Sequence, residues 1–401
     1  MKMARSQRGG PPATKLQAVR VQQGRSQDQV IRLVIMRASL LNIAVASESS
    51  LKVMLSRWEN GHDQVTEPGY RRLFREIYGR TNEELGFPSE VLNEGAAELR
   101  DRLIVARSID GETLDLFQQQ VNMIRGSDKR FGAIAALDQL SSLIKHMEEV
   151  HAFSVNAKHR KRLAAILTDA RTLAGWNALD RGSQLQAWKY HEDAKVSAGE
   201  AGAPHLLAHA AAQQAVILLD LGDATGAVEL LEYARSVAEN KVPAVLQSWL
   251  AAAHGEGLAA AGRRNEALRA FDQADEWLPA DPVDPEMPFL LLNSGQLARW
   301  RGNGLTKLGE QEAIEQLEAA ARELESPNGT AIREGSAIRG LNWLYVDLAF
   351  AYSAAGDREA AIAYAQRARR LASQIGSDRQ RQRLESLILP GASAPLLRDA
   401  R

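Results

Sequence analysis

The chain has 401 residues, of which 45% are hydrophobic and 25% are charged, and its formal net charge is −1. This length is enough for two or three domains with buried cores, and the near-neutral charge argues against a general nucleic-acid coat protein. There is no cysteine, which excludes a disulfide framework and thiol chemistry.

The sequence contains neither a membrane span nor a secretion signal. No uninterrupted apolar stretch approaches the ~18 residues needed to cross a bilayer, and the N-terminus lacks an apolar signal segment. We therefore expect a cytoplasmic protein without a membrane partner.

The chain begins with a segment that cannot bury a core. Residues 1–14 include Arg5, Arg8 and the pairs Gly9-Gly10 and Pro11-Pro12. We expect a disordered arm, and an arm that enters the DNA minor groove is the alternative.

Two helices are expected next. The first is basic, runs from about residue 15 to 23 and ends at Gly24. The second starts near Ser26, whose hydroxyl can cap its N-terminus. The stretch 31–48 is largely apolar until Ala46, which predicts an elongated second helix or an extra turn of helix.

Residues 50–61 predict an amphipathic helix that Gly61 ends. Its apolar face comprises Leu51, Met54, Leu55 and Trp58, and its outer face comprises Lys52, Val53, Ser56 and Arg57. Such a helix can lie in a DNA major groove, because Arg and Lys suit guanine O6 and N7 and Ser suits base or phosphate. The alternative is an ordinary amphipathic surface helix.

A further helix with Pro68, Tyr70 and Phe74 follows, and residues 85–88 end the unit. Residues 15–88 resemble the phage-repressor-like helix-turn-helix proteins of the XRE family, in the form common in actinomycete regulators. The markers are Gly24, Ser26-Gln27, SRWENG at 56–61 and YGRTNEELGF at 78–87. The resemblance implies that base edges are contacted by Lys52, Val53 and Arg57, with Ser56 on base or phosphate, and phosphates by Arg25, Gln27 and Asn60.

The charge is polarised along the chain. Residues 1–88 carry 14 Lys and Arg against 8 Asp and Glu, whereas the remainder carries 35 against 42. A basic head on an acidic body is typical of a sequence-specific DNA-binding protein with a separate regulatory domain.

Residues 89–158 have apolar stripes and predict a linker helix followed by a first helical pair. Beyond them an internal repeat begins. Gly182, Gly222 and Gly262 are 40 residues apart, and an alanine follows each of them after five and after twelve residues. The register returns at Gly356 and, more loosely, at Gly309. Small residues let two antiparallel helices approach closely, with the glycine at their turn.

This pattern resembles tetratricopeptide repeats over about residues 160–375, with a period longer than the standard 34 residues. The predicted fold is therefore all-α: a helix-turn-helix domain at 15–88, then a tetratricopeptide-like α-solenoid at 159–388 and a tail at 389–401. The best copy contains Gly255, Gly262, Ala267, Phe271, Ala274 and Pro279.

Stacked hairpins curve, so the first helix of each repeat lines a concave groove. Amides, an arginine and aromatic rings there suit an extended peptide, since Asn and Gln pair with its backbone and Arg takes its carboxylate. The alternative is that the aromatic residues fill the core between hairpins. By register the groove contains Trp176, His209, Trp249, Glu256, Gln296, Arg299, Asn303, Trp343 and Phe350.

A helix-turn-helix head on such a body resembles the peptide-pheromone receptors of Gram-positive bacteria. The resemblance implies quorum sensing, in which a signalling peptide binds the groove of a homodimer and alters its contact with an inverted-repeat operator in double-stranded DNA. A protein effector is another possible ligand. The alternative function is an interaction scaffold whose head does not bind DNA.

The sequence does not favour an enzyme, a metal site or a cofactor. His205 and His209 share a helical face, yet no carboxylate accompanies them in a metalloprotease arrangement. The segment 301–304 lacks the glycine and lysine spacing of a phosphate-binding loop.

Overall fold

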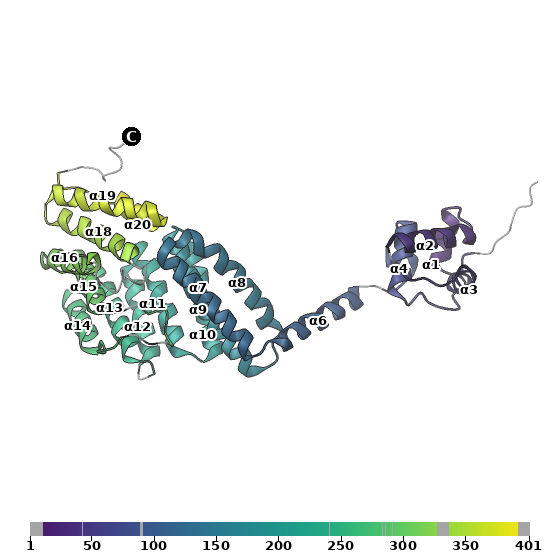
Figure 1. The fold of residues 1–401 in the computed structure, drawn as a ribbon, viewed down its shortest axis with the longest axis horizontal. Helices are drawn as coiled ribbons and strands as arrows, with labels where there is room; N and C mark the ends of the chain where they lie inside the picture. The colour runs from purple at the N-terminus through teal and green to yellow at the C-terminus, as the bar shows by residue number, and fades with distance from the viewer. Residues whose placement is uncertain are drawn as a thin grey trace, which may run out of the picture. The chain divides into compact units, whose positions relative to one another are not determined.

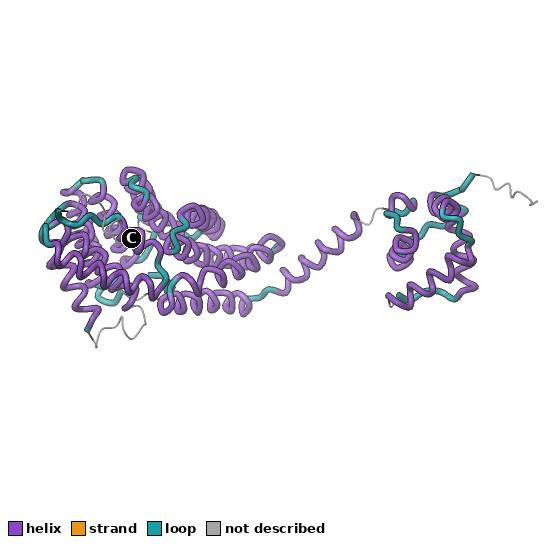
Figure 2. The backbone as a smooth tube through the Cα atoms, turned by 90° about the horizontal axis from the view of Figure 1, so that it is seen from above, coloured by secondary structure: helices purple, strands orange, loops and turns teal. Residues whose placement is uncertain are grey.

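The computed structural model shows two compact helical units, Met1–Arg102 and Leu103–Arg401. In the residues that it describes there are helices and loops but no strand (Figure 2), which confirms the predicted all-α class. The described residues are 11–41, 43–88, 91–239, 241–282, 284, 286–290, 292–326 and 337–391, without the side chains of 91–95, 134, 135 and 337. The N-terminal residues of the predicted arm and the last residues of the predicted tail lie outside them.

The first unit is built around large side chains. Trp58 lies at its centre, 5.2 Å from the ring of Tyr70 and 5.8 Å from that of Phe74, between ring centroids. Aromatic pairs in such tilted and edge-on arrangements add stability beyond the area that they bury. Its helices are α1 (Lys15–Gln22), α2 (Gln27–Leu41), α3 (Glu48–Glu59), α4 (Pro68–Tyr78) and α5 (Asn82–Leu85) (Figure 1).

The long apolar stretch between the second and third predicted helices is mostly helix. α2 continues to Leu41, so the expectation of an elongated second helix is confirmed. The connection then packs on the core through Val45, and the Ala46 N–H donates to the hydroxyl of Tyr70 at 2.8 Å. Ser47 ends the connection by capping α3 through a hydrogen bond from the Ser50 N–H.

The helix α6 (Val91–Ser108) crosses the boundary between the two units. No helix in the described part of the chain is both long and apolar enough to span a membrane.

The second unit is an array of helical hairpins (Figure 1). Within the hairpins α9 packs on α10, α11 on α12, α13 on α14, α15 on α16 and α18 on α19. Its helices are α7 (Gly111–Phe131), α8 (Ala133–Phe153), α9 (Ala157–Asp180), α10 (Gln184–Ala201), α11 (Pro204–Asp220), α12 (Ala224–Ala238), α13 (Ala244–Ala260), α14 (Arg264–Trp277), α15 (Ser294–Leu308), α16 (Glu312–Glu325), α18 (Ala337–Ala354), α19 (Arg358–Ile375) and α20 (Asp378–Glu385).

The small residues of the repeat lie where the sequence predicts. Gly222 forms the turn between α11 and α12 with φ of 81°, a conformation that glycine adopts without strain. Gly255 lies inside a hairpin, where a Cβ atom would come within 2.7 Å of the Phe271 ring. These contacts confirm a tetratricopeptide-like architecture of closely packed helical pairs.

The last helices of this unit pack against the first ones, α19 on α7 and α20 on α9. Polar groups join them: Arg339 donates two hydrogen bonds of 2.8 Å to Asp128, and Arg379 donates one of 2.8 Å to Asp220. The C-terminal hairpin therefore closes on the N-terminal end of the same unit, and the array encloses a cavity.

Candidate functional site

The outer face of α3 is the first candidate site. Leu51, Leu55 and Trp58 are buried in the core of the first unit, as the pattern predicts. On the opposite face the Val53 side chain is 60% exposed, and Lys52 and Arg57 are exposed beside it. The core therefore holds a short helix that presents a basic and apolar strip to solvent.

Both cations of this strip have carboxylate neighbours. Lys52 lies 3.1 Å from Asp28, and Arg57 lies 2.7 Å from Asp63. All four side chains are about half exposed, and ion pairs of this kind stabilise a protein by only ~0–1 kcal/mol. A phosphate or a base edge can therefore compete for these cations.

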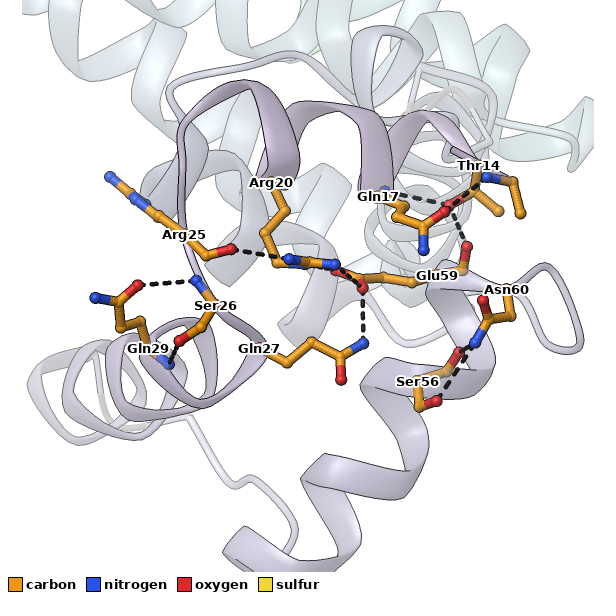
Figure 3. Close-up of polar contacts among 11 residues, drawn as sticks. Thr14, Gln17, Arg20, Arg25, Ser26, Gln27, Gln29, Ser56, Glu59 and Asn60 are labelled. Atoms are coloured by element: carbon orange, nitrogen blue, oxygen red, sulfur yellow. Dashed lines mark hydrogen bonds and ion pairs between the residues drawn. The ribbon is translucent and has the colours of Figure 1, made fainter. Parts of the chain in front are cut away.

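The C-terminal end of α3 is fixed by Asn60. Its side-chain amide donates to the Ser56 carbonyl at 2.8 Å and to the Ser56 hydroxyl at 3.4 Å (Figure 3). Ser56 is half-buried, whereas Asn60 is exposed. Both side chains thus lie at the end of the exposed strip.

The sequence analysis missed the polar centre of this unit, Glu59. Its carboxylate is buried and accepts from Arg20 Nε at 2.6 Å, from Arg20 Nη2 at 2.9 Å and from Gln27 Nε2 at 2.8 Å (Figure 3). The hydrogen bonds that Arg20 donates to Glu59 raise the pKa of Arg20. This cluster ties α1, α2 and α3 together. A signal was present, because Glu59 falls four residues after Leu55 on the apolar face.

Two residues that were predicted to contact phosphate form hydrogen bonds within the first unit. Arg25 donates to the Ile77 carbonyl at 2.8 Å and lies over the Tyr78 ring, 5.8 Å from its centroid. Gln27 is held by Glu59. The part of these two residues in DNA binding stays a prediction.

The cavity of the second unit is the other candidate site. Its volume is ≈ 610 Å³, within the range of sites for small molecules and short peptides. Phe350 does not line it and lies instead under Arg383, 5.8 Å from the guanidinium. The other residues predicted for the groove all line the cavity: Trp176, His209, Trp249, Glu256, Gln296, Arg299, Asn303 and Trp343.

One part of the cavity wall is aromatic. The His209 ring stacks on Phe289 at 4.4 Å and lies 5.1 Å from Trp249, between centroids, while Trp249 lies 5.4 Å from Trp300. Burial lowers the pKa of His209 to about 3, so its imidazole is neutral at pH 7. Trp249 also belongs to the hydrophobic core, so it fills space between hairpins and lines the cavity.

The remainder of the wall is charged. Lys307 donates to Glu256 at 2.7 Å, and Arg125 donates to Asp169 at 2.6 Å. Burial raises the pKa of Glu256, but the ammonium of Lys307, together with the charges of Arg299 and Arg379, outweighs burial and lowers the pKa to about 2. Cavity charges of opposite sign are therefore paired at these points. Among the residues that the structure describes, no three His, Asp or Glu side chains are grouped to hold a metal ion.

Comparison with known proteins gives no family for the chain. No family model matches it, and no curated protein matches it. Two solved structures resemble it, both of the nearly identical TPR-like repeats of a candidate kinesin light chain from Podosopora anserina. They share 17% and 16% identity, with TM-scores of 0.32 and 0.33, and cover 51% and 52% of this chain and 94% and 95% of their own. TM-scores this low do not support a fold assignment. The tetratricopeptide-like architecture is inferred from the packing of the helical hairpins instead.

Proposed function

We propose that this protein is a ligand-responsive, sequence-specific DNA-binding transcriptional regulator. The observation that carries the proposal is the solvent-facing strip of α3, where Lys52, Val53 and Arg57 lie side by side on a helix whose other face is buried. Arg and Lys on such a strip match guanine O6 and N7, and Val matches the thymine methyl group.

In this proposal α2 and α3 form the helix-turn-helix of an XRE-type domain, with α3 in the major groove. The buried cluster of Glu59, Arg20 and Gln27 supports it, because a reading helix must keep its tilt to place side chains on bases. The excess of 14 basic over 8 acidic residues in 1–88 supplies the attraction to phosphate.

A homodimer on an inverted-repeat operator follows from the size of the reading surface. One recognition helix contacts only a few base pairs, so two-fold repetition is needed for a unique site in a genome. The cavity of the second unit supports an effector, such as a signalling peptide, that changes how the two reading helices are presented.

The second candidate function is a repeat-based interaction scaffold whose first unit does not bind DNA. The observation in its favour is that Lys52 and Arg57 already have acidic partners, Asp28 and Asp63. Arrays of helical hairpins also serve many protein partners.

One experiment separates the two functions. Genomic DNA fragments are selected with the full-length protein at physiological salt, and the recovered sequence is tested by gel shift against a scrambled competitor. The regulator predicts an inverted-repeat site, and Arg57→Ala should reduce discrimination by about 10- to 100-fold. The matched control is Arg80→Ala, which removes an exposed arginine paired with Glu84 outside α3. Weak, salt-sensitive and sequence-blind binding would leave the scaffold as the function.

A further inference from the structure

Of the five arginines that line the cavity, four donate hydrogen bonds to the carboxylate of an aspartate and one has only a long ion pair. The hydrogen bonds run from Arg125 to Asp169 at 2.6 Å, from Arg339 to Asp128 at 2.8 Å, from Arg379 to Asp220 at 2.8 Å and from Arg383 to Asp347 at 2.9 Å. Arg299 also lines the cavity, yet it makes no hydrogen bond to any residue in the described part of the chain.

The nearest carboxylate to Arg299 is that of Asp347, whose Oδ2 lies 3.9 Å from its Nη1. This distance is too long for a hydrogen bond, and the other oxygen of Asp347 accepts from Arg383 at 2.9 Å. The side chain of Arg299 is only 17% exposed, and burial lowers its pKa. Its nitrogens are not among the buried atoms that lack a hydrogen-bond partner, so its N–H groups stay accessible from the cavity.

Two tryptophans hold this guanidinium in place. Its centre lies 5.1 Å from the Trp343 ring centroid and 5.9 Å from that of Trp300. Stacking on aromatic faces leaves the in-plane N–H groups free, and these form the fork that binds a carboxylate through two parallel hydrogen bonds. The group is therefore positioned before any ligand arrives.

Unpartnered polar atoms lie near this arginine. Asn303 follows Arg299 by one helical turn on α15 and is 7% exposed, and its Oδ1 has no hydrogen-bond partner among the described residues. The Trp343 Nε1 is buried and equally without a partner there. Two residues that line the cavity next to Arg299 thus each keep a buried polar atom without a partner in the described part of the chain, one an acceptor and one a donor.

We propose that the cavity binds an effector that carries one carboxylate next to an amide N–H group. Arg299 holds the carboxylate, and the Asn303 Oδ1 accepts the N–H. The C-terminus of a short peptide and a free N-acyl amino acid share this chemistry, and ≈ 610 Å³ admits ligands of that size. The assignment of this ligand as the effector rests on the proposed function, whereas the binding site itself does not.

The charges around Arg299 favour a monoanion over a phosphate group. Asp347 and Glu256 both act on it electrostatically from within the cavity, and Arg383 and Arg379 act on it in the opposite sense. The two carboxylates partly offset the positive charge that a ligand meets there. They would repel a second negative charge, and the other lining arginines are already bound to aspartates. The aromatic wall of Trp249 and Phe289 suits an apolar side chain next to the carboxylate.

The test uses full-length protein and two mixtures of tetrapeptides that differ only in a free C-terminal carboxylate or a C-terminal carboxamide. Ligands retained on size-exclusion are identified by mass spectrometry and measured by calorimetry, and N-acetyl-phenylalanine is tested in parallel. We expect carboxylate forms to bind at least ~10-fold more tightly than their carboxamides, since hydrogen bonds to charged groups are the strong ones. Binding of the peptides indicates that the ligand is the C-terminus of a short peptide, and binding of N-acetyl-phenylalanine indicates a free N-acyl amino acid.

Variants of the anchor complete the test. Arg299→Leu should abolish the preference for the carboxylate, and Arg299→Lys should recover only part of it because an ammonium lacks the planar fork. Arg301→Leu is the matched control, since it lies on the same helix and pairs with Asp272 and Asp275 rather than lining the cavity. Asn303→Asp places a repelling charge beside the ligand and should also abolish binding.

The proposal would be overturned by equal binding of carboxylate and carboxamide forms, by binding of neither the peptide mixtures nor N-acetyl-phenylalanine, or by unchanged binding in a folded Arg299→Leu protein. Circular dichroism checks that each variant is folded. None of these results depends on DNA. The gel shift with the selected operator therefore reports on the proposed function separately from this ligand site.

Discussion

The two units differ in how they treat buried polar groups. In the first unit the buried Glu59 carboxylate accepts three hydrogen bonds, and the buried Arg71 donates to the Val65 carbonyl at 2.7 Å. In the second unit buried polar atoms of His191, Asn303 and Trp343 have no partner among the described residues. Among the described residues the first unit leaves only the Tyr78 hydroxyl buried without a partner, whereas the second unit leaves several such atoms, including those of the cavity residues Asn303 and Trp343.

Their packing differs as well. Large aromatic rings such as Trp58 and Phe74 fill the first core, and α3 cannot shift without moving them. Alanines and glycines at helix contacts, such as Ala227 and Gly255, let the helices of the second unit pack closely. The proposed function would use both features, a reading helix held at a fixed tilt and a cavity that a ligand can fill.

The largest expected effect comes from breaking the polar centre of the first unit. Glu59→Ala leaves the half-buried guanidinium of Arg20 without its carboxylate, and losing one partner of a buried pair costs up to about 3–5 kcal/mol. Hydrogen exchange of the α1, α2 and α3 amides in the full chain measures the change in local stability.

The control for this prediction is Glu76→Ala, which removes an exposed partner of Arg72 and should change stability by less than ~1 kcal/mol. If the two variants had equal effects on exchange, the Glu59 cluster would not be what holds these helices together.

The second prediction concerns an unpartnered group of the second unit. Burial, with a smaller contribution from Lys195, lowers the pKa of His191 to about 3. The unfolded chain takes up this proton near pH 6.5 and the folded chain does not, so the stabilising contribution is present above pH 6.5 and is lost as the pH falls toward 3. Between pH 7 and pH 5 this residue alone should lower the free energy of unfolding by about 2 kcal/mol.

Urea titrations of wild type and His191→Leu at both pH values check this loss. The variant should lose about 2 kcal/mol less than wild type over the same interval. An identical pH dependence in the two proteins would mean that His191 is charged, and therefore paired, in the folded state.

Sequence patterns predicted most of the helices and the hairpin turns of the fold. Periods of 3.6 residues located the helices, and the spacing of Gly182, Gly222 and Gly262 located the hairpin turns, because both depend on neighbours close in the chain. The register of first helices also placed Trp249, Arg299 and Asn303 on the cavity wall. Phe350 was placed there too and does not line it.

The sequence did not predict which charged groups of the cavity pair with one another. Arg339 is paired with Asp128 across 211 positions of sequence, and Arg379 with Asp220 across 159. Closure of the array decides which aspartate meets which arginine, and local pattern holds no information on closure. That Arg299 is the one without a hydrogen bond to a carboxylate therefore emerges only from the folded unit.

The last prediction has the smallest expected effect and concerns the difference in packing between the two units. It compares the same change, Gly to Ala, at two glycines that both lie in helices. A methyl group on Gly255 would come within 2.7 Å of the rigid Phe271 ring, so Gly255→Ala should destabilise the second unit by about 1–3 kcal/mol. At Gly199, also in a helix, nothing lies within 4 Å of the added carbon. Gly199→Ala should therefore stabilise the unit by about 0.5–1 kcal/mol through helix propensity alone. Opposite signs in thermal unfolding would show that close helix contact is required at Gly255, while equal signs would remove small-residue packing as the distinction between the two units.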